Sequence, residues 1–165
     1  MFKIENGWFI ILMLCAFIFG WVTTDKARER SVKSIYEVKS SIDEVNIERI
    51  IIIESSGNPY ALNERSGARG LMQITPICLK EWNNENLDKY TLDDLYNPVI
   101  NKRIGTWYMN EKIPTYLWAY NIKDTIENRL IAYNWGIGNL RNYVNGKLKN
   151  LPYETKRYIK KYREV

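Results

Sequence analysis

Four consecutive isoleucines constrain the fold of this chain most, because they lead directly into an acidic residue. One helix face, with i, i+3, i+4 and i+7 spacing, is formed by Ile47, Ile50, Ile51 and Glu54. Gly57 lies just beyond, where glycine commonly ends a helix. Four isoleucines also suit a strand, but the glycine favours a helix that is apolar on nearly every side and central to the fold. Burying a carboxylate without compensation costs several kcal/mol, so Glu54 needs a functional reason.

The other predicted helices begin at N-terminal signals, namely a capping residue or a proline in the first turn. These signals are Thr75–Pro76, Asn97–Pro98, Ile113–Pro114, Asp124 with Glu127 as a capping box, and Leu151–Pro152. We expect Gly136 and Gly138 to end the helix that follows Asp124. Strand signals are few, so the predicted fold class is mainly α, with little or no β structure and short loops.

The N-terminal segment differs in composition from the rest, since all four Phe lie within the first 19 residues. Residues 8–22 carry no charge, and as a helix they would span about 22 Å, short of a hydrocarbon core of about 30 Å. We predict that residues 1–24 are a signal anchor or a signal peptide, and we favour the anchor because no convincing cleavage site follows. Residues 25–42 are predicted to be a charged helical linker, and residues 43–165 the main domain.

Composition removes several kinds of chemistry. The chain has no histidine, which excludes Ser-His-Asp catalysis and the usual zinc sites. Only Cys78 lies beyond the N-terminal segment, so no disulfide forms within the domain, and we expect this thiol to be a small buried hydrophobe. We expect no metal and no organic cofactor. Catalysis would have to use carboxylates, lysine, tyrosine or backbone groups.

The net charge of +5 is concentrated at the C-terminus, where the last 25 residues hold eight Lys or Arg and two Glu. This basic tail indicates either a surface for an anionic polymer or membrane, or a solvated helix face. A nucleic-acid partner is not expected, because no reading helix or stacking platform stands out.

Four blocks of sequence together resemble a known family. They are "ESSGNP", "SGARGLMQITP", "AYNWGIGN" and "LPYETKRYIKKY". From about Asp43 to the C-terminus the chain resembles, in order and spacing, the soluble lytic transglycosylase (SLT) domain of the lysozyme superfamily. The resemblance implies a lysozyme-like helical domain that cuts peptidoglycan glycan strands between N-acetylmuramic acid (MurNAc) and N-acetylglucosamine (GlcNAc), with Glu54 as the single catalytic acid and base.

The physical interpretation of Glu54 agrees with this resemblance. A carboxyl group in an apolar pocket has a raised pKa, because desolvation penalises its charged form. A proton that is retained near neutral pH can be given to a glycosidic oxygen. The isoleucines before Glu54 would therefore help to keep it an acid.

The resemblance also implies a set of substrate-binding residues. They are Ser55, Gly70, Met72, Gln73, Tyr133, Asn134, Glu154 and Tyr158. The alternative for Met72 and Tyr133 is packing in the core, and for Glu154 with Tyr158, at i and i+4, a surface helix pair. Gly136 and Gly138 do not form a phosphate loop, since no strand precedes them and no third glycine accompanies them.

Glu64 is a candidate second carboxylate. Most glycosidases need two, whereas a lytic transglycosylase needs one, because the substrate's acetamido group assists and its C6 hydroxyl replaces water. The product is then a 1,6-anhydro sugar. Glu54 plus Glu64 would instead suit a hydrolase similar to goose-type lysozyme. We favour Glu64 as an exposed loop residue, and a non-catalytic wall-binding module is a further alternative.

The predicted location is the cell membrane, with the catalytic domain outside the cytoplasm, or secretion if the N-terminal segment is cleaved. The flanking charges conflict with this orientation. Four basic residues lie within residues 25–33, against Lys3 at the other end, and the positive-inside rule would place the domain inside. The biological task and any partner in a secretion or envelope machinery are left open.

Overall fold

A computed structural model describes residues 44–165 of the chain. The predicted N-terminal segment and linker, residues 1–24 and 25–42, lie outside the described residues. Within residues 44–165, no helix has both the length and the apolar character needed to cross a membrane.

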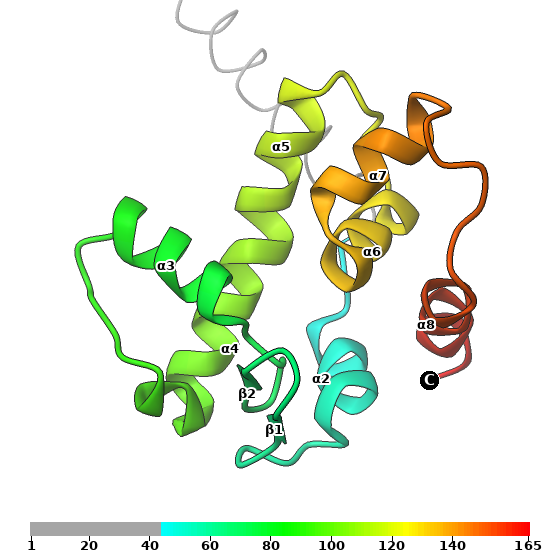
Figure 1. Ribbon diagram of the computed structural model, residues 1–165. Helices are drawn as coiled ribbons and strands as arrows, with labels where there is room; N and C mark the ends of the chain where they lie inside the picture. Colours follow the sequence, from blue (N-terminus) through cyan, green and yellow to red (C-terminus); the bar gives the residue numbers. More distant parts are fainter. Residues whose placement is uncertain (1–43) are drawn as a thin grey trace, which may run out of the picture. The chain divides into compact units, whose positions relative to one another are not determined.

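The described chain is mainly helical, with one two-stranded antiparallel hairpin (Figure 1). The elements are α2 (Ile47–Ser55), β1 (Leu62–Asn63), β2 (Ala68–Arg69), α3 (Pro76–Glu85), the 3-10 helix η1 (Asp93–Tyr96), α4 (Pro98–Trp107), the π-helical turn η2 (Tyr108–Lys112), α5 (Ile113–Ala119), α6 (Ile126–Trp135), α7 (Ile137–Val144) and α8 (Tyr153–Glu164). The prediction of a mainly α fold with little β structure is confirmed for these residues.

Two predicted helix starts are confirmed in detail. The side chain of Thr75 accepts a hydrogen bond from the Cys78 N–H, and Pro76 is the first residue of α3. Asn97 accepts from the N–H groups of the second and third residues of α4. In each case a polar cap satisfies amides that have no partner inside the helix.

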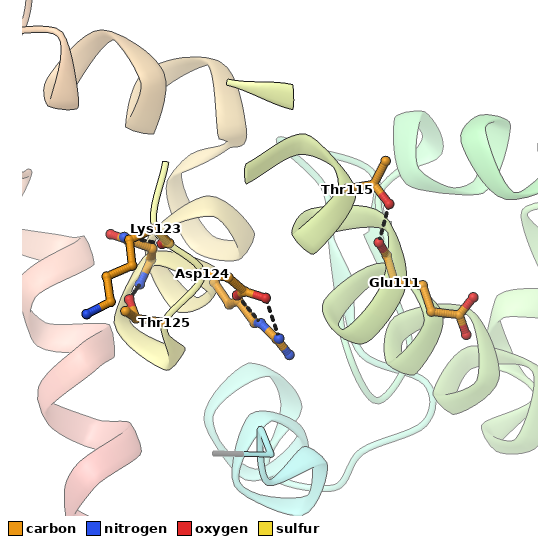
Figure 2. Close-up of polar contacts among 7 residues, drawn as sticks. Glu111, Thr115, Lys123, Asp124 and Thr125 are labelled. Carbon is orange, nitrogen blue, oxygen red and sulfur yellow. Dashed lines mark hydrogen bonds and ion pairs between the residues drawn. The ribbon is translucent and has the colours of Figure 1, made fainter. Parts of the chain in front are cut away.

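The predicted capping box at Asp124 is wrong by one residue. Thr125 is the cap of α6, and its hydroxyl accepts from the Asn128 N–H at 3.2 Å. Asp124 instead forms a two-armed ion pair with Arg129, at 2.6 and 2.7 Å (Figure 2). A bidentate pair with a buried guanidinium is stronger than a single cap bond, so Thr125 takes the capping role.

The prediction that Gly136 and Gly138 both end a helix is half right. Gly136 has φ of 93° and follows the last residue of α6. Gly138 lies inside α7, a helix that the sequence analysis did not predict. The central helix α2 is also less buried than expected, because Ile50 is fully buried whereas Ile52 is 49% exposed.

The helix predicted to begin at Ile113–Pro114 is confirmed as α5 (Ile113–Ala119), although it continues directly from the α4–η2 helix. The turn η2 joins α4 to α5, and the two run on as one long helix in Figure 1. The Ile113 N–H bonds to the Tyr108 carbonyl, five residues back. Pro114 has no N–H to give to the carbonyl of residue 110, so a wide turn directly before it is a physically reasonable arrangement. Thr115 donates its hydroxyl to the Glu111 carbonyl in the same region, at 2.8 Å (Figure 2).

Helix α8 packs against α2 and α6. The contact with α2 is fixed at its start, where the Asn46 N–H bonds to the Tyr162 hydroxyl at 2.8 Å and Arg49 Nη1 bonds to the Tyr162 carbonyl at 3.0 Å. Tyr158, one turn earlier, is also buried in this contact. The last described helix is thereby held alongside the helix that carries the acid.

Candidate active site

Glu54 is the penultimate residue of α2, and its partly buried carboxyl group meets a side chain from α8. The Tyr158 hydroxyl donates a hydrogen bond to Glu54 Oε1 at 2.8 Å. Two residues from the first and last of the four blocks, 104 positions apart in the chain, are therefore in direct contact.

Burial raises the pKa of Glu54 from its ordinary 4.5 to about 7. The hydrogen bond from Tyr158 opposes this shift, because it stabilises the charged form. Two charges on α8 have smaller effects: Glu154 raises the pKa and Lys161 lowers it. At neutral pH the group is therefore close to half protonated, which suits a residue that must both give and take a proton.

Two tyrosines near the acid are held in their neutral form. Burial raises the pKa of Tyr158 and of Tyr133 well above the usual 10, and the charge of Glu54 adds to the effect in both. Both hydroxyls therefore remain hydrogen-bond donors across the physiological pH range. Tyr158 can donate to the Glu54 carboxylate whenever that group is ionised.

The loop Gly70–Gln73 is attached to the site by two side-chain bonds to its backbone. Ser55 Oγ donates to the Leu71 carbonyl at 2.8 Å, and Tyr133 Oη donates to the Met72 carbonyl at 2.7 Å. Ser55 directly follows the acid in α2, so the loop lies against the end of that helix. Both side chains, which the family resemblance places on the substrate, here bind the protein backbone.

Gly70 and Met72 support the site from within the core. Met72 is fully buried, and a Cβ added to Gly105 would lie 2.3 Å from its sulfur. Gly70 is also buried, with φ of 77°. Both residues are therefore buried, whereas the expectation was that they line the cleft. Gln73 has φ of 49°, is partly exposed, and its amide donates to the Gly70 carbonyl at 3.1 Å.

Asn101 is a site-supporting residue that the sequence analysis missed. Its side chain is fully buried, and its Oδ1 accepts from the Met72 N–H at 2.8 Å. Its Nδ2 donates to the carbonyls of Arg69 and Leu95, both at 2.8 Å. The sequence did offer one signal: Asn101 is a polar residue three positions before Ile104, and so lies on the buried face of α4.

A groove of about 390 Å³ brings together three of the predicted residues, Gln73, Tyr133 and Asn134. It is lined by the start of α3, the end of α6 and the start of α7. A larger cavity of about 690 Å³ lies between α3 and α4 and contains Leu71, but it contains none of the predicted site residues. Glu54 is not among the residues that line the smaller groove, but Tyr133 lines it and lies close enough to Glu54 for the charge of that carboxyl group to raise the tyrosine pKa. We therefore assign the candidate site to Glu54 and the smaller groove.

The remaining two candidates are exposed. Glu154 lies in the first turn of α8, and its charge acts on Glu54. Glu64 lies in the turn between β1 and β2. Within residues 44–165, no cluster of three or more His, Cys, Asp or Glu side chains is placed to hold a metal ion.

Replacing Tyr158 by Phe is expected to raise the pKa of Glu54 above about 7, since the hydrogen bond that favours the carboxylate is lost. If Glu54 is the acid, the alkaline limb of the kcat/KM profile should then move to higher pH. The matched control is Tyr162→Phe, one turn along α8, whose hydroxyl bonds to the Asn46 N–H instead. A limb that stays in place or moves to lower pH in Tyr158→Phe would contradict the assignment.

Comparison with known proteins adds a family match and two relatives. Residues 32–154 match the family model of the Transglycosylase SLT domain. The match begins inside the predicted linker and ends before Tyr158. Membrane-bound lytic murein transglycosylase E of Buchnera aphidicola subsp. Acyrthosiphon pisum (strain APS) is 40% identical over 111 residues, which are 66% of this chain and 45% of that protein. The protein of the same name from Buchnera aphidicola subsp. Baizongia pistaciae (strain Bp) is 40% identical over 80 residues, 47% of this chain and 37% of that protein.

The aligned part of this chain thus spans less than half the length of each of these relatives. No solved structure was found to match the chain.

Proposed function

Because the chain belongs to the Transglycosylase SLT domain family, we propose that it is a peptidoglycan lytic transglycosylase that cuts between MurNAc and GlcNAc and leaves 1,6-anhydro-MurNAc ends. The observation that supports this most is the partly buried Glu54, whose pKa is raised to about 7 beside the Tyr158 hydroxyl. The test is mass spectrometry of digested peptidoglycan, in which anhydro products are one water lighter than the products of hydrolysis.

The proposed first step uses Glu54 as an acid. Its proton passes to the glycosidic oxygen, the bond from that oxygen to C1 of MurNAc breaks, and the substrate's acetamido group supports the positive charge that develops at C1. In the second step the Glu54 carboxylate takes the proton of the C6 hydroxyl, and the C6 oxygen bonds to C1. The acid is regenerated and no water is consumed, so one carboxylate serves both proton transfers.

Neighbouring residues support these steps in different ways. Tyr158 donates to the Glu54 carboxylate between the two transfers, when that group carries its charge. Ser55 and Tyr133 hold the Gly70–Gln73 loop against the acid. We assign the contact with the glycan strand to Gln73 and Asn134, which line the groove.

The hydrolase alternative makes a different prediction for Glu64, which is exposed in the hairpin turn. An inverting hydrolase needs its second carboxylate about 6.5–9.5 Å from the acid, with a water between them. We expect Glu64→Ala to leave the cleavage rate nearly unchanged and the products to be anhydro sugars. Reducing-end products together with a large rate loss in this variant would make the protein a lysozyme.

We also propose that residues 1–24 anchor the domain to the membrane on the side where peptidoglycan lies. The charge-free run of residues 8–22 supports this proposal, as do the names of the two relatives, which are membrane-bound. Residues 25–42 would then link the anchor to the domain. Protease accessibility in intact cells tests the orientation, and recovery of a shortened chain in the medium would indicate cleavage and secretion instead.

A further inference from the structure

Glu81 lies in the groove of the candidate site but outside all four sequence blocks. It is in the second turn of α3, and its side chain lines the groove together with Gln73, Tyr133 and Asn134. Among the described residues that line this groove, it is the one with an acidic or basic side chain. The volume of about 390 Å³ lies within the range of ordinary ligand pockets.

One carboxyl oxygen of Glu81 lacks a donor. Its Oε2 is buried and has no hydrogen-bond partner among the described residues. The Tyr116 hydroxyl faces the same carboxyl group, and the pKa of Tyr116 is raised by burial and then by the charge and hydrogen bond of Glu81. The nearby cation on η2 is already engaged, because Lys112 Nζ pairs with Glu85 and lies over the ring of Tyr116. Leaving a buried acceptor without a donor is costly, and such groups in folded proteins point to a strained or functional position.

We propose that Glu81 binds a primary ammonium group of the substrate in this groove and so gives the enzyme a preference for amine-bearing glycan. A carboxylate can only accept, so its partner must be a donor, and an ammonium group supplies both the donor and the opposite charge. The ammonium could be on a sugar that lacks its acetyl group or on a peptide attached to the strand. The inference rests on the proposed function, since it assumes that glycan occupies the groove.

The experiment measures binding in the full-length chain in detergent, in a Glu54→Gln background so that no probe is consumed. Two probes are the β-1,4-linked tetramer of glucosamine and its fully N-acetylated counterpart. Two more are a peptidoglycan fragment with its peptide amine free and the same fragment with that amine acetylated. Calorimetry gives the Kd of each probe with and without Glu81→Gln. The two pairs of probes separate the two sources of the amine.

Glu81→Gln is expected to weaken binding of at least one amine-bearing probe by about tenfold or more, as expected for loss of a charged hydrogen bond. Binding of the acetylated partner of that probe should change little. The matched control is Glu85→Gln, one turn along α3, whose carboxyl pairs with Lys112 and does not line the groove. Glu85→Gln should leave the Kd values of all four probes unchanged.

Equal changes for amine-bearing and acetylated probes would overturn the inference, as would the same loss of affinity in Glu85→Gln. The proposed function is judged separately, from the products of the otherwise unaltered chain. If the products are anhydro sugars but binding shows no preference for amines, the role of Glu81 is wrong and the proposed function stands. If Glu81 binds amines but the chain does not cleave peptidoglycan, the proposed function is wrong and the amine-binding site stands.

Discussion

Replacing Glu54 by Gln is expected to lower the rate of peptidoglycan cleavage by at least about 100-fold, because general acid–base catalysis contributes typically 10²–10⁴-fold. The amide keeps the shape of the side chain but cannot donate a proton to a glycosidic oxygen. The loss should lie near the upper end of that range, since the same residue is proposed to serve both transfers. Turbidity of a peptidoglycan suspension, together with mass spectrometry of the released sugars, measures the effect.

The same substitution is expected to stabilise the folded chain at pH 8. The pKa of Glu54 is about 7 in the folded state against an ordinary 4.5, so folding is penalised when the group is charged. The penalty is absent below about pH 4.5, grows as pH rises, and is complete above about pH 7. At about 1.4 kcal/mol per pH unit it amounts to roughly 3 kcal/mol at most. Thermal unfolding at pH 4.5 and pH 8 compares the two proteins.

Glu64→Gln is the matched control for both measurements, because it makes the same chemical change at an exposed position. It should alter neither the cleavage rate nor the pH dependence of unfolding appreciably. Near wild-type clearing by Glu54→Gln would remove the enzymatic assignment and favour a non-catalytic wall-binding module. An equal gain of stability at both pH values would show that burial of the charge is not its cause.

Replacing Gly70 by Ala is expected to destabilise the domain by roughly 3 kcal/mol through two separate effects. The backbone has φ of 77°, a left-handed conformation that costs a residue with a side chain roughly 1–2 kcal/mol. An added Cβ would also lie 2.2 Å from Asn101 Nδ2 and 2.3 Å from the Leu95 carbonyl oxygen. Overpacking of this kind costs typically 1–3 kcal/mol. The midpoint of urea unfolding should fall while its slope stays the same.

Gly146→Ala separates the two effects, since Gly146 has a similar φ of 72° but nothing within 4 Å of an added Cβ. It should show the backbone cost alone. If Gly70→Ala lowers the free energy of unfolding no more than Gly146→Ala does, the Asn101 side chain must move aside for the added Cβ at little cost. Because the loop carries the backbone that Ser55 and Tyr133 bind, Gly70→Ala should also lower the cleavage rate.

The sequence predicted where several helices start, because N-terminal capping is a local interaction. Thr75 and Asn97 cap residues two or three positions away, so their role can be read from the chain alone. Asp124 and Thr125 are both good caps, and the choice between them depends on Arg129, whose side chain takes the carboxylate. Local patterns could not decide that competition.

The sequence identified the acidic residue of the candidate site, but it did not identify the residue that supports the site from the core. Glu54 was identified by its position after an apolar run and by resemblance, and its raised pKa follows from burial. Asn101 was missed because its partners are backbone groups, among them the Arg69 carbonyl 32 residues away, and a sequence does not show which amides will meet. Helix α7 was missed because Gly138 was expected to end a helix. In the structure Gly138 is an exposed residue within the first turn of α7.

The π-helical turn η2 changes how this chain must be aligned with others. An ordinary α-helix joins each backbone N–H to the carbonyl four residues back, but in η2 the Ile113 N–H bonds to the Tyr108 carbonyl, five residues back. The turn therefore acts as a one-residue insertion that rotates all later side chains by about 100°. A relative whose helix is regular throughout would need a single gap within residues 108–112. Without that gap, every position of α5 would be paired with a residue from the wrong face of the helix.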